Sequence, residues 1–168
     1  GWLFGVGHFS LGLAWIATAF TFQSKMPPVL GWVAVVGLAM FLALYTGLAA
    51  ALAKALAKRP LALALVLALA ASWMLGEWLR GWVLTGFAWN PLGAAWLAVP
   101  GVPQLAALAG AVALSGLMVL AGGGVWLVTQ RGSRVAGLAL VGAVALAGAA
   151  GTQLLRGGIR ADAPEVFL

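Results

Sequence analysis

Long apolar stretches constrain the fold of this chain more than any other feature. Five of them approach the roughly 20 residues that a helix needs to cross a hydrocarbon core about 30 Å thick. They lie at about 1–21, 29–53, 61–80, 105–128 and 135–155. Each must be helical, because unpaired backbone groups are not tolerated in lipid and no alternation typical of a barrel strand is visible. The sequence therefore predicts an all-α membrane protein, a polytopic transmembrane helix bundle over residues 1–155.

The composition excludes a soluble domain and argues against a nucleic-acid-binding protein. Only 7% of the residues are charged, whereas soluble domains have about 25%. The formal net charge of +6 comes from nine Lys and Arg that are spread between the apolar stretches. A nucleic-acid-binding surface needs such residues clustered on a water-exposed face. We therefore expect membrane lipids, and no nucleic acid, among the partners.

The connections between the stretches differ in charge, which predicts the side of the membrane on which each lies. The basic residues of one side are Lys54, Lys58, Arg59, Arg131 and Arg134, with no acid beside them. The other side has Lys25, Arg80 and a tail in which Arg156 and Arg160 accompany Asp162 and Glu165. Cytoplasmic loops carry an excess of Lys and Arg. Segments 54–60 and 129–134 are therefore expected in the cytoplasm, and segments 22–28, 81–104 and the C-terminal tail in the periplasm.

Residues 81–104 form a connection that is too apolar for a solvated loop. It contains three tryptophans and a phenylalanine at Trp82, Phe87, Trp89 and Trp96. Indole rings prefer the headgroup level of a membrane. We call this segment the aromatic arm, and we expect it to lie at the outer interface or to fold back as a re-entrant arm.

The chain offers few candidates for catalysis or metal binding. It has no cysteine and one histidine, His8, and none of its serines lies in a G-x-S-x-G motif. His8 could meet Ser115 from a facing helix, as in an intramembrane serine protease, but no sequence feature selects that pair. A hydrogen bond within the bundle is the simpler role for His8. One histidine, one glutamate in the membrane region and no cysteine cannot supply the ligands of a usual metal site, so no metal or cofactor is expected.

Glu77 and Arg80 are the charged residues that remain to be explained. They are three residues apart, so they share a helix face and can form an ion pair. Arg80 also precedes Gly81, where a cation complements the helix C-terminus and glycine can form a left-handed cap. One hypothesis is therefore structural: an ion pair allows the helix to end at the outer interface.

The alternative hypothesis is lipid binding. Arginine matches the geometry of a phosphate group well, and ionisable residues at membrane depth often have a function. In this interpretation Arg80 and Lys25 hold a phospholipid phosphate, while Trp82, Phe87 and Trp89 shape an entrance for acyl chains. The candidate lipid or substrate contacts are Glu77, Arg80, Trp82, Phe87, Trp89 and Lys25.

Three segments resemble motifs of one known family. The segment "EWLRGWVLTGFAWNPLG" resembles the E-[FW]-L-R-G-W-[VL]-x-T-G-F-P-W motif of bacterial apolipoprotein N-acyltransferases. The earlier segments "GVGHFSLGLAWI" and "FLALYTGLAA" are similar to two of that family's spans. Together they cover most of residues 1–121, in the order the family has. One position departs from the pattern: Ala88 replaces the usual proline, which leaves the backbone dihedral there free.

The resemblance implies an integral enzyme of the bacterial inner membrane. Such enzymes transfer an acyl chain from a phospholipid to the N-terminal diacylglyceryl-cysteine of apolipoproteins. Their Glu base, Lys and Cys nucleophile belong to a nitrilase-like periplasmic domain, where a thioester acyl-enzyme forms. No position here matches those three residues, and 156–168 looks like the lead-in to that domain. We therefore expect a membrane fragment that anchors the catalytic domain, presents lipid and is inactive alone.

A transporter or lipid-scrambling module is the alternative function. It predicts inverted repeats and helices broken near the midplane of the membrane, and the sequence shows neither. A purely structural anchor would explain the apolar spans but not the long specific motif at 77–93.

Overall fold

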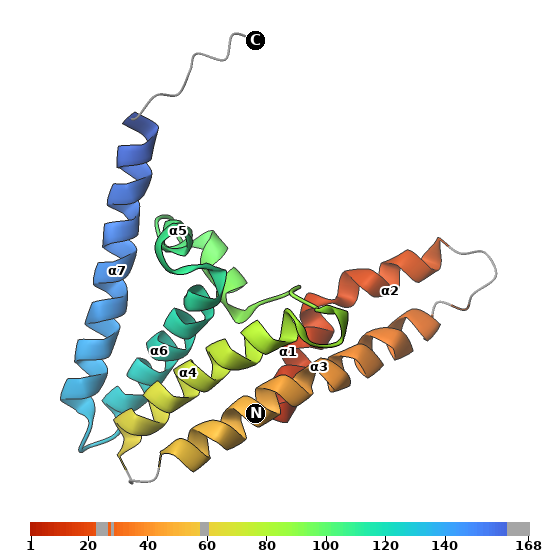
Figure 1. Cartoon of the computed structure of the whole chain (residues 1–168), viewed down its shortest axis with the longest axis horizontal. Coiled ribbons are helices and arrows are strands. Elements are labelled where there is room, and N and C mark those ends of the chain that lie inside the picture. Colours follow the sequence, from red (N-terminus) through yellow and green to blue (C-terminus); the bar gives the residue numbers. More distant parts are fainter. Residues whose placement is uncertain (23–26, 28, 58–60, 161–168) are drawn as a thin grey trace.

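The computed structural model describes residues 1–22, 27, 29–57 and 61–160, and these contain helices and turns without any β-strand (Figure 1). The long helices are α1 (Trp2–Gly12), α2 (Ala14–Thr21), α3 (Val29–Leu56), α4 (Ala62–Arg80), α6 (Ala111–Thr129) and α7 (Arg134–Arg160). Between α4 and α6 lie the short elements η1 (Val83–Thr85), η2 (Leu92–Ala98), η3 (Pro103–Leu105) and α5 (Ala106–Ala109). The predicted all-α fold is confirmed.

Four of these helices are long and apolar enough to cross a membrane: α3, α4, α6 and most of α7. A fifth span is present if α1 and α2 count as one, because they meet at a bend of 43°. The sequence predicted one helix over 1–21. The helix is interrupted at Leu13, whose backbone leaves the helical region at φ −105° and ψ 8°. The protein is thus a multi-pass membrane protein, as the apolar stretches indicate.

The other predicted boundaries also shift. The stretch expected at 105–128 is divided, because Gly110 adopts a φ of 79° and separates α5 from α6. A positive φ of this kind cannot continue a right-handed helix, and glycine adopts it without steric cost. The second and last helices run further than expected, to Leu56 and Arg160.

The helices pack in the order α1, α3, α4, α6 and α7, each against the next, and α2 packs on α3. A buried apolar cluster joins α1, α2 and α3 and includes Phe9, Leu13, Val35 and Leu42. Close approach depends on small residues: a Cβ at Gly5 would lie 2.9 Å from the Ala43 side chain. Lipid tails do not drive apolar helices together, so such close packing must hold them in place.

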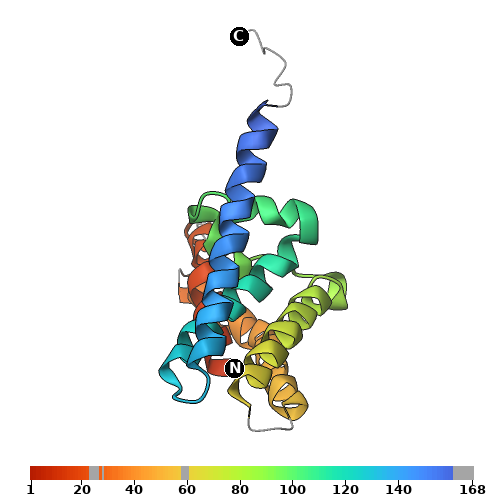
Figure 2. The same cartoon turned by 90° about the vertical axis from the view of Figure 1, so that its left-hand side faces the viewer.

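The ends of the helices separate into two groups. The end of α3, the start of α4 and the turn between α6 and α7 gather at one end of the bundle (Figures 1 and 2). The aromatic arm and the last turns of α7 lie toward the opposite end, where α7 extends beyond the other helices. The arm folds back onto the bundle, with Gly93, Gly101 and Val102 buried.

Candidate functional site: the docked aromatic arm

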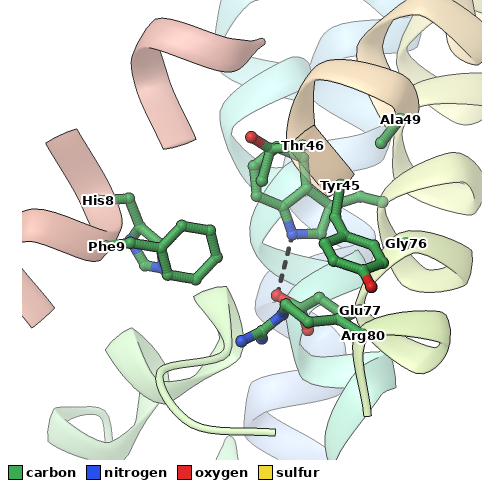
Figure 3. A pocket seen from close by; sticks show the side chains of 9 residues that line it. His8, Phe9, Tyr45, Thr46, Ala49, Gly76, Glu77 and Arg80 are labelled. Carbon is green, nitrogen blue, oxygen red and sulfur yellow. Dashed lines mark hydrogen bonds between the residues drawn. The ribbon is translucent and has the colours of Figure 1, made fainter. Parts of the chain in front are cut away.

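The last turns of α4 present two charged side chains to the interior of the bundle (Figure 3). Glu77 Oε1 accepts two hydrogen bonds, one from the indole Nε1 of Trp73 at 3.0 Å and one from the backbone N–H of Leu92 at 2.8 Å. Trp73 is one turn earlier on the same face of α4, whereas Leu92 begins η2 of the arm. Glu77 therefore ties the arm to the helix from which the arm departs.

Arg80 holds the same segment of the arm from the inside. Its Nη1 donates to the carbonyl oxygens of Phe87 at 2.9 Å and Trp89 at 2.6 Å. The guanidinium carbon lies 5.0 Å from the ring centroid of Phe9 on α1, and only 2% of the residue is exposed. The backbone N–H of Phe87 donates in return to the Arg80 carbonyl at 2.7 Å. One buried guanidinium thus connects α4, the arm and α1.

Two parts of the structural hypothesis for this turn are wrong. The hydrogen bonds of Glu77 and Arg80 go to other partners, and no ion pair joins the two within the described part of the chain. Gly81 follows α4 with an ordinary right-handed conformation, at φ −71° and ψ −15°. Spacing along a helix shows that two charged side chains can meet. It does not show that carbonyl oxygens of a returning loop accept the hydrogen bonds of the arginine instead.

A reciprocal pair of hydrogen bonds fastens the arm to α1. The ring Nε2 of His8 is 3.1 Å from the carbonyl oxygen of Asn90, and Asn90 Nδ2 donates to the carbonyl oxygen of His8 at 3.2 Å. Asn90 has a φ of 54°, a left-handed conformation that asparagine tolerates better than most residues. Its side chain lies directly against Gly12, where no Cβ could fit.

The next part of the arm docks on α6 and α7 through its backbone. The N–H of Gly93 donates to Ser115 Oγ at 2.7 Å, and the Trp96 indole donates to the Leu114 carbonyl at 3.0 Å. Gly101 meets α7 where Gly151 leaves room, because a Cβ on Gly151 would clash with the Gly101 carbonyl. Ser115 is fully buried, so its hydroxyl provides the partner that the Gly93 N–H needs away from water.

The candidate lipid contacts divide into two classes. Trp82 and Trp89 are 74% and 66% exposed, and Trp89 lies 6.3 Å from Trp15 between ring centroids. Phe87 is partly buried against the cluster around Phe9. Glu77 and Arg80 point inward, as described above, and Lys25 lies outside the described residues.

Neither a nucleophilic pair nor a metal site is formed by the described residues. Ser115 Oγ accepts from Gly93 while His8 is bonded to Asn90, so the two residues contact different partners. No group of three or more His, Cys, Asp or Glu side chains is close enough to hold a metal ion within the part of the chain that the structure describes. The polar side chains of this site therefore hold the arm in place.

Sequence reasoning missed two members of this site, Trp73 and Asn90, and considered Ser115 only as a partner of His8. Asn90 lies within the motif at 77–93 and His8 is the only histidine of the chain, so each could have been noted. No pattern in the sequence indicates that they meet, because 82 residues separate them.

Comparison with known proteins identifies the family. The model of the apolipoprotein N-acyltransferase N-terminal domain matches residues 1–124, which include α1 to α4, the aromatic arm and the side chains that hydrogen-bond to it. The chain belongs to this family.

Curated relatives extend the similarity into the last helices. An apolipoprotein N-acyltransferase of Caulobacter vibrioides is 40% identical over 158 residues, which are 93% of this chain and 29% of that protein. Those of Brucella suis and Allorhizobium ampelinum are 39% and 36% identical over 71% and 84% of this chain. The chain spans between a fifth and a third of the length of these three relatives, 22–29%. It corresponds to the N-terminal membrane part of the family.

Proposed function

We propose that this chain works as the membrane part of an N-acyltransferase, which transfers an acyl chain from a phospholipid to the N-terminal diacylglyceryl-cysteine of apolipoproteins. The family match over residues 1–124 carries this proposal. The phospholipid donor and the diacylated lipoprotein acceptor are the partners, and the inner membrane of a bacterium is the location.

The chemical step itself belongs to residues outside these 168. The resemblance implies a cysteine nucleophile with a glutamate base and a lysine, and this chain has no cysteine. The relatives are more than three times as long as the matched region, which leaves room for a separate catalytic domain. The chain alone is therefore inactive, and its role is to anchor that domain and to present lipid to it.

The docked arm is the part that presents lipid. Trp82 and Trp89 are exposed, and indole rings at a membrane surface partition between headgroups and acyl chains. The burial of Arg80 favours a positioning role: with Glu77 it holds the backbone that carries the two tryptophans. Phe87 packs against the apolar cluster around Phe9, and Lys25 remains a candidate contact for a phosphate group.

Removing the exposed tryptophans of the arm tests the presentation of lipid. In the full-length enzyme, Trp82→Ala combined with Trp89→Ala should slow formation of the acyl-enzyme on phospholipid vesicles about tenfold or more, since aromatic anchors dominate such contacts. The melting temperature should stay near that of the parent, because both side chains are mostly exposed.

The matched control is Trp126→Ala, which removes an exposed tryptophan near the end of α6. It should leave both the rate and the melting temperature near the parent values. Equal slowing by the control, or full activity of the double variant, would contradict lipid presentation by the arm.

The topology follows from the basic connections. Segments 54–60 and 129–134 are cytoplasmic, and segments 22–28, 81–104 and the C-terminal tail are periplasmic. The gathering of the end of α3, the start of α4 and the turn between α6 and α7 at one end supports this assignment (Figure 1). A reporter that is active only in the periplasm should be active when fused after Leu168 and inactive when fused after Arg131. Reversed signals would contradict the charge rule for this chain.

A further inference from the structure

One oxygen of the Glu77 carboxylate has no partner. Glu77 Oε1 accepts two hydrogen bonds, but Oε2 is buried and no described group bonds to it. Leaving a buried polar atom without a hydrogen bond costs about 1–3 kcal/mol, and more when the group is charged. Such atoms are usually satisfied by ordered water when no protein group is available.

A small cavity that Glu77 helps to line lies at the meeting point of α1, α3 and α4 (Figure 3). It provides about 10 Å³ of room for a water-sized sphere. One water molecule needs roughly 10–15 Å³ by this measure. A phosphate group or an alkylammonium headgroup needs several times that volume, so the size of the cavity selects water over a lipid headgroup.

The walls offer the hydrogen-bond partners that an internal water requires. Arginine has five N–H donors, and the hydrogen bonds of Arg80 use only those of Nη1. Tyr45 lines the cavity, and its hydroxyl makes none of the hydrogen bonds found among the described residues. Thr46 Oγ1 donates to Ala43 and keeps lone pairs to accept with. Together with Glu77 Oε2 these groups meet the two to four partners that buried waters have.

We propose that one water molecule occupies this cavity, donates to Glu77 Oε2, and accepts from the Arg80 guanidinium or the Tyr45 hydroxyl. The water then supplies the partner that Glu77 Oε2 lacks. It completes the bonding of the carboxylate that ties the arm to α4, so the docked arm depends on a bound water as well as on the protein. This inference concerns the bonding of the arm and does not depend on the acyl-transfer reaction.

A high-resolution structure of the full-length protein tests the proposal directly. One density peak is expected within hydrogen-bond distance of Glu77 Oε2 and of either Arg80 or Tyr45. An empty cavity, a lipid atom in it, or a direct Glu77–Arg80 ion pair that closes it would overturn the proposal.

A matched pair of glycine substitutions tests the water by displacement. A Cβ on Gly76, which lines the cavity, would lie 3.4 Å from the Tyr45 carbonyl oxygen and therefore fits there. Gly37→Ala in α3 meets nothing within 4 Å and serves as the control. Both should gain the helix propensity of alanine. Gly76→Ala should nevertheless have the lower melting temperature and lack the density peak, and equal melting temperatures with the peak retained in both would count against this water site.

Discussion

The two halves of the aromatic arm are held by different kinds of interaction. The front half, residues 81–92, is bound through the side chains of Glu77, Arg80 and Asn90. The rear half, residues 93–104, is bound by hydrogen bonds from Gly93 and Trp96 to α6 and by close backbone packing, because neither Gly93 nor Gly151 leaves room for a larger residue. Directional hydrogen bonds fix the position of a segment atom by atom, whereas close packing fixes it by shape.

This difference matches what each half displays. The front half carries the exposed tryptophans Trp82 and Trp89, whereas the large exposed side chains of the rear half, Leu97 and Val99, are aliphatic. A few polar groups on the inner side can hold the front half of the arm without covering its outer face. The rear half has Gly93, Gly101 and Val102 buried and works as the base of the arm.

The largest loss of stability is expected from Arg80→Ala, which removes the guanidinium group that holds the front half of the arm. It leaves the carbonyl oxygens of Phe87 and Trp89 without their donor, and it removes the guanidinium cation that lies over the Phe9 ring. We expect the full-length protein to lose about 3 kcal/mol of stability, since hydrogen bonds from charged groups contribute roughly 1.5–3 kcal/mol each. Thermal unfolding in detergent measures the loss.

Arg80→Lys keeps the charge but has no planar fork to bridge two carbonyl groups. It should recover only part of the stability. Full recovery by lysine would show that charge alone holds the front half, against the geometry described above.

The rear half should be most sensitive to added volume. A Cβ on Gly93 would lie 2.7 Å from both the Leu114 Cβ and the Ser115 backbone nitrogen. Gly93→Ala should therefore cost about 2 kcal/mol, as overpacking of a tight site does. Gly122→Ala in α6 meets nothing within 4 Å, so the same unfolding measurement should show no loss for it. A neutral Gly93→Ala would mean that the rear half is not held by shape.

The smallest effect is expected from Ser115→Ala, which leaves the Gly93 N–H buried without an acceptor. The cost should be about 1–2 kcal/mol. The chain provides its own control, because Ser72 is also buried and its Oγ has no partner. Ser72→Ala should be neutral or slightly stabilising in chemical or thermal unfolding. Equal losses for the two serines would mean that burial, rather than the bond to Gly93, determines the result.

Much of the fold could be predicted from the sequence, because the membrane leaves few choices. Apolar stretches of about 20 residues in lipid must be helices, and four of the five predicted spans contain one helix of sufficient length. The bend at Leu13 and the break at Gly110 were not predicted. The bend lies beside a segment that returns from elsewhere in the chain, with Asn90 against Gly12, and such a contact leaves no local pattern.

The position of the candidate site could be predicted from the sequence, but the contacts between its residues could not. The aromatic motif at 77–93 pointed to the correct region, and the predicted fold-back of the arm agrees with the structure. The predicted ion pair did not, because helical spacing brings Glu77 and Arg80 to one face but says nothing about competing partners. Leu92, Phe87 and Trp89 supply those partners through backbone atoms, which every residue has and no sequence pattern distinguishes.

The sequence by itself determined that this protein is a helical membrane protein of its family, since hydropathy and motif spacing depend only on the order of residues. The tertiary structure alone decided how its few charges are used. A buried charge takes whichever hydrogen-bond partners the fold brings within reach. Here the fold returned the arm over the end of α4, so Glu77 and Arg80 bind the arm and not each other.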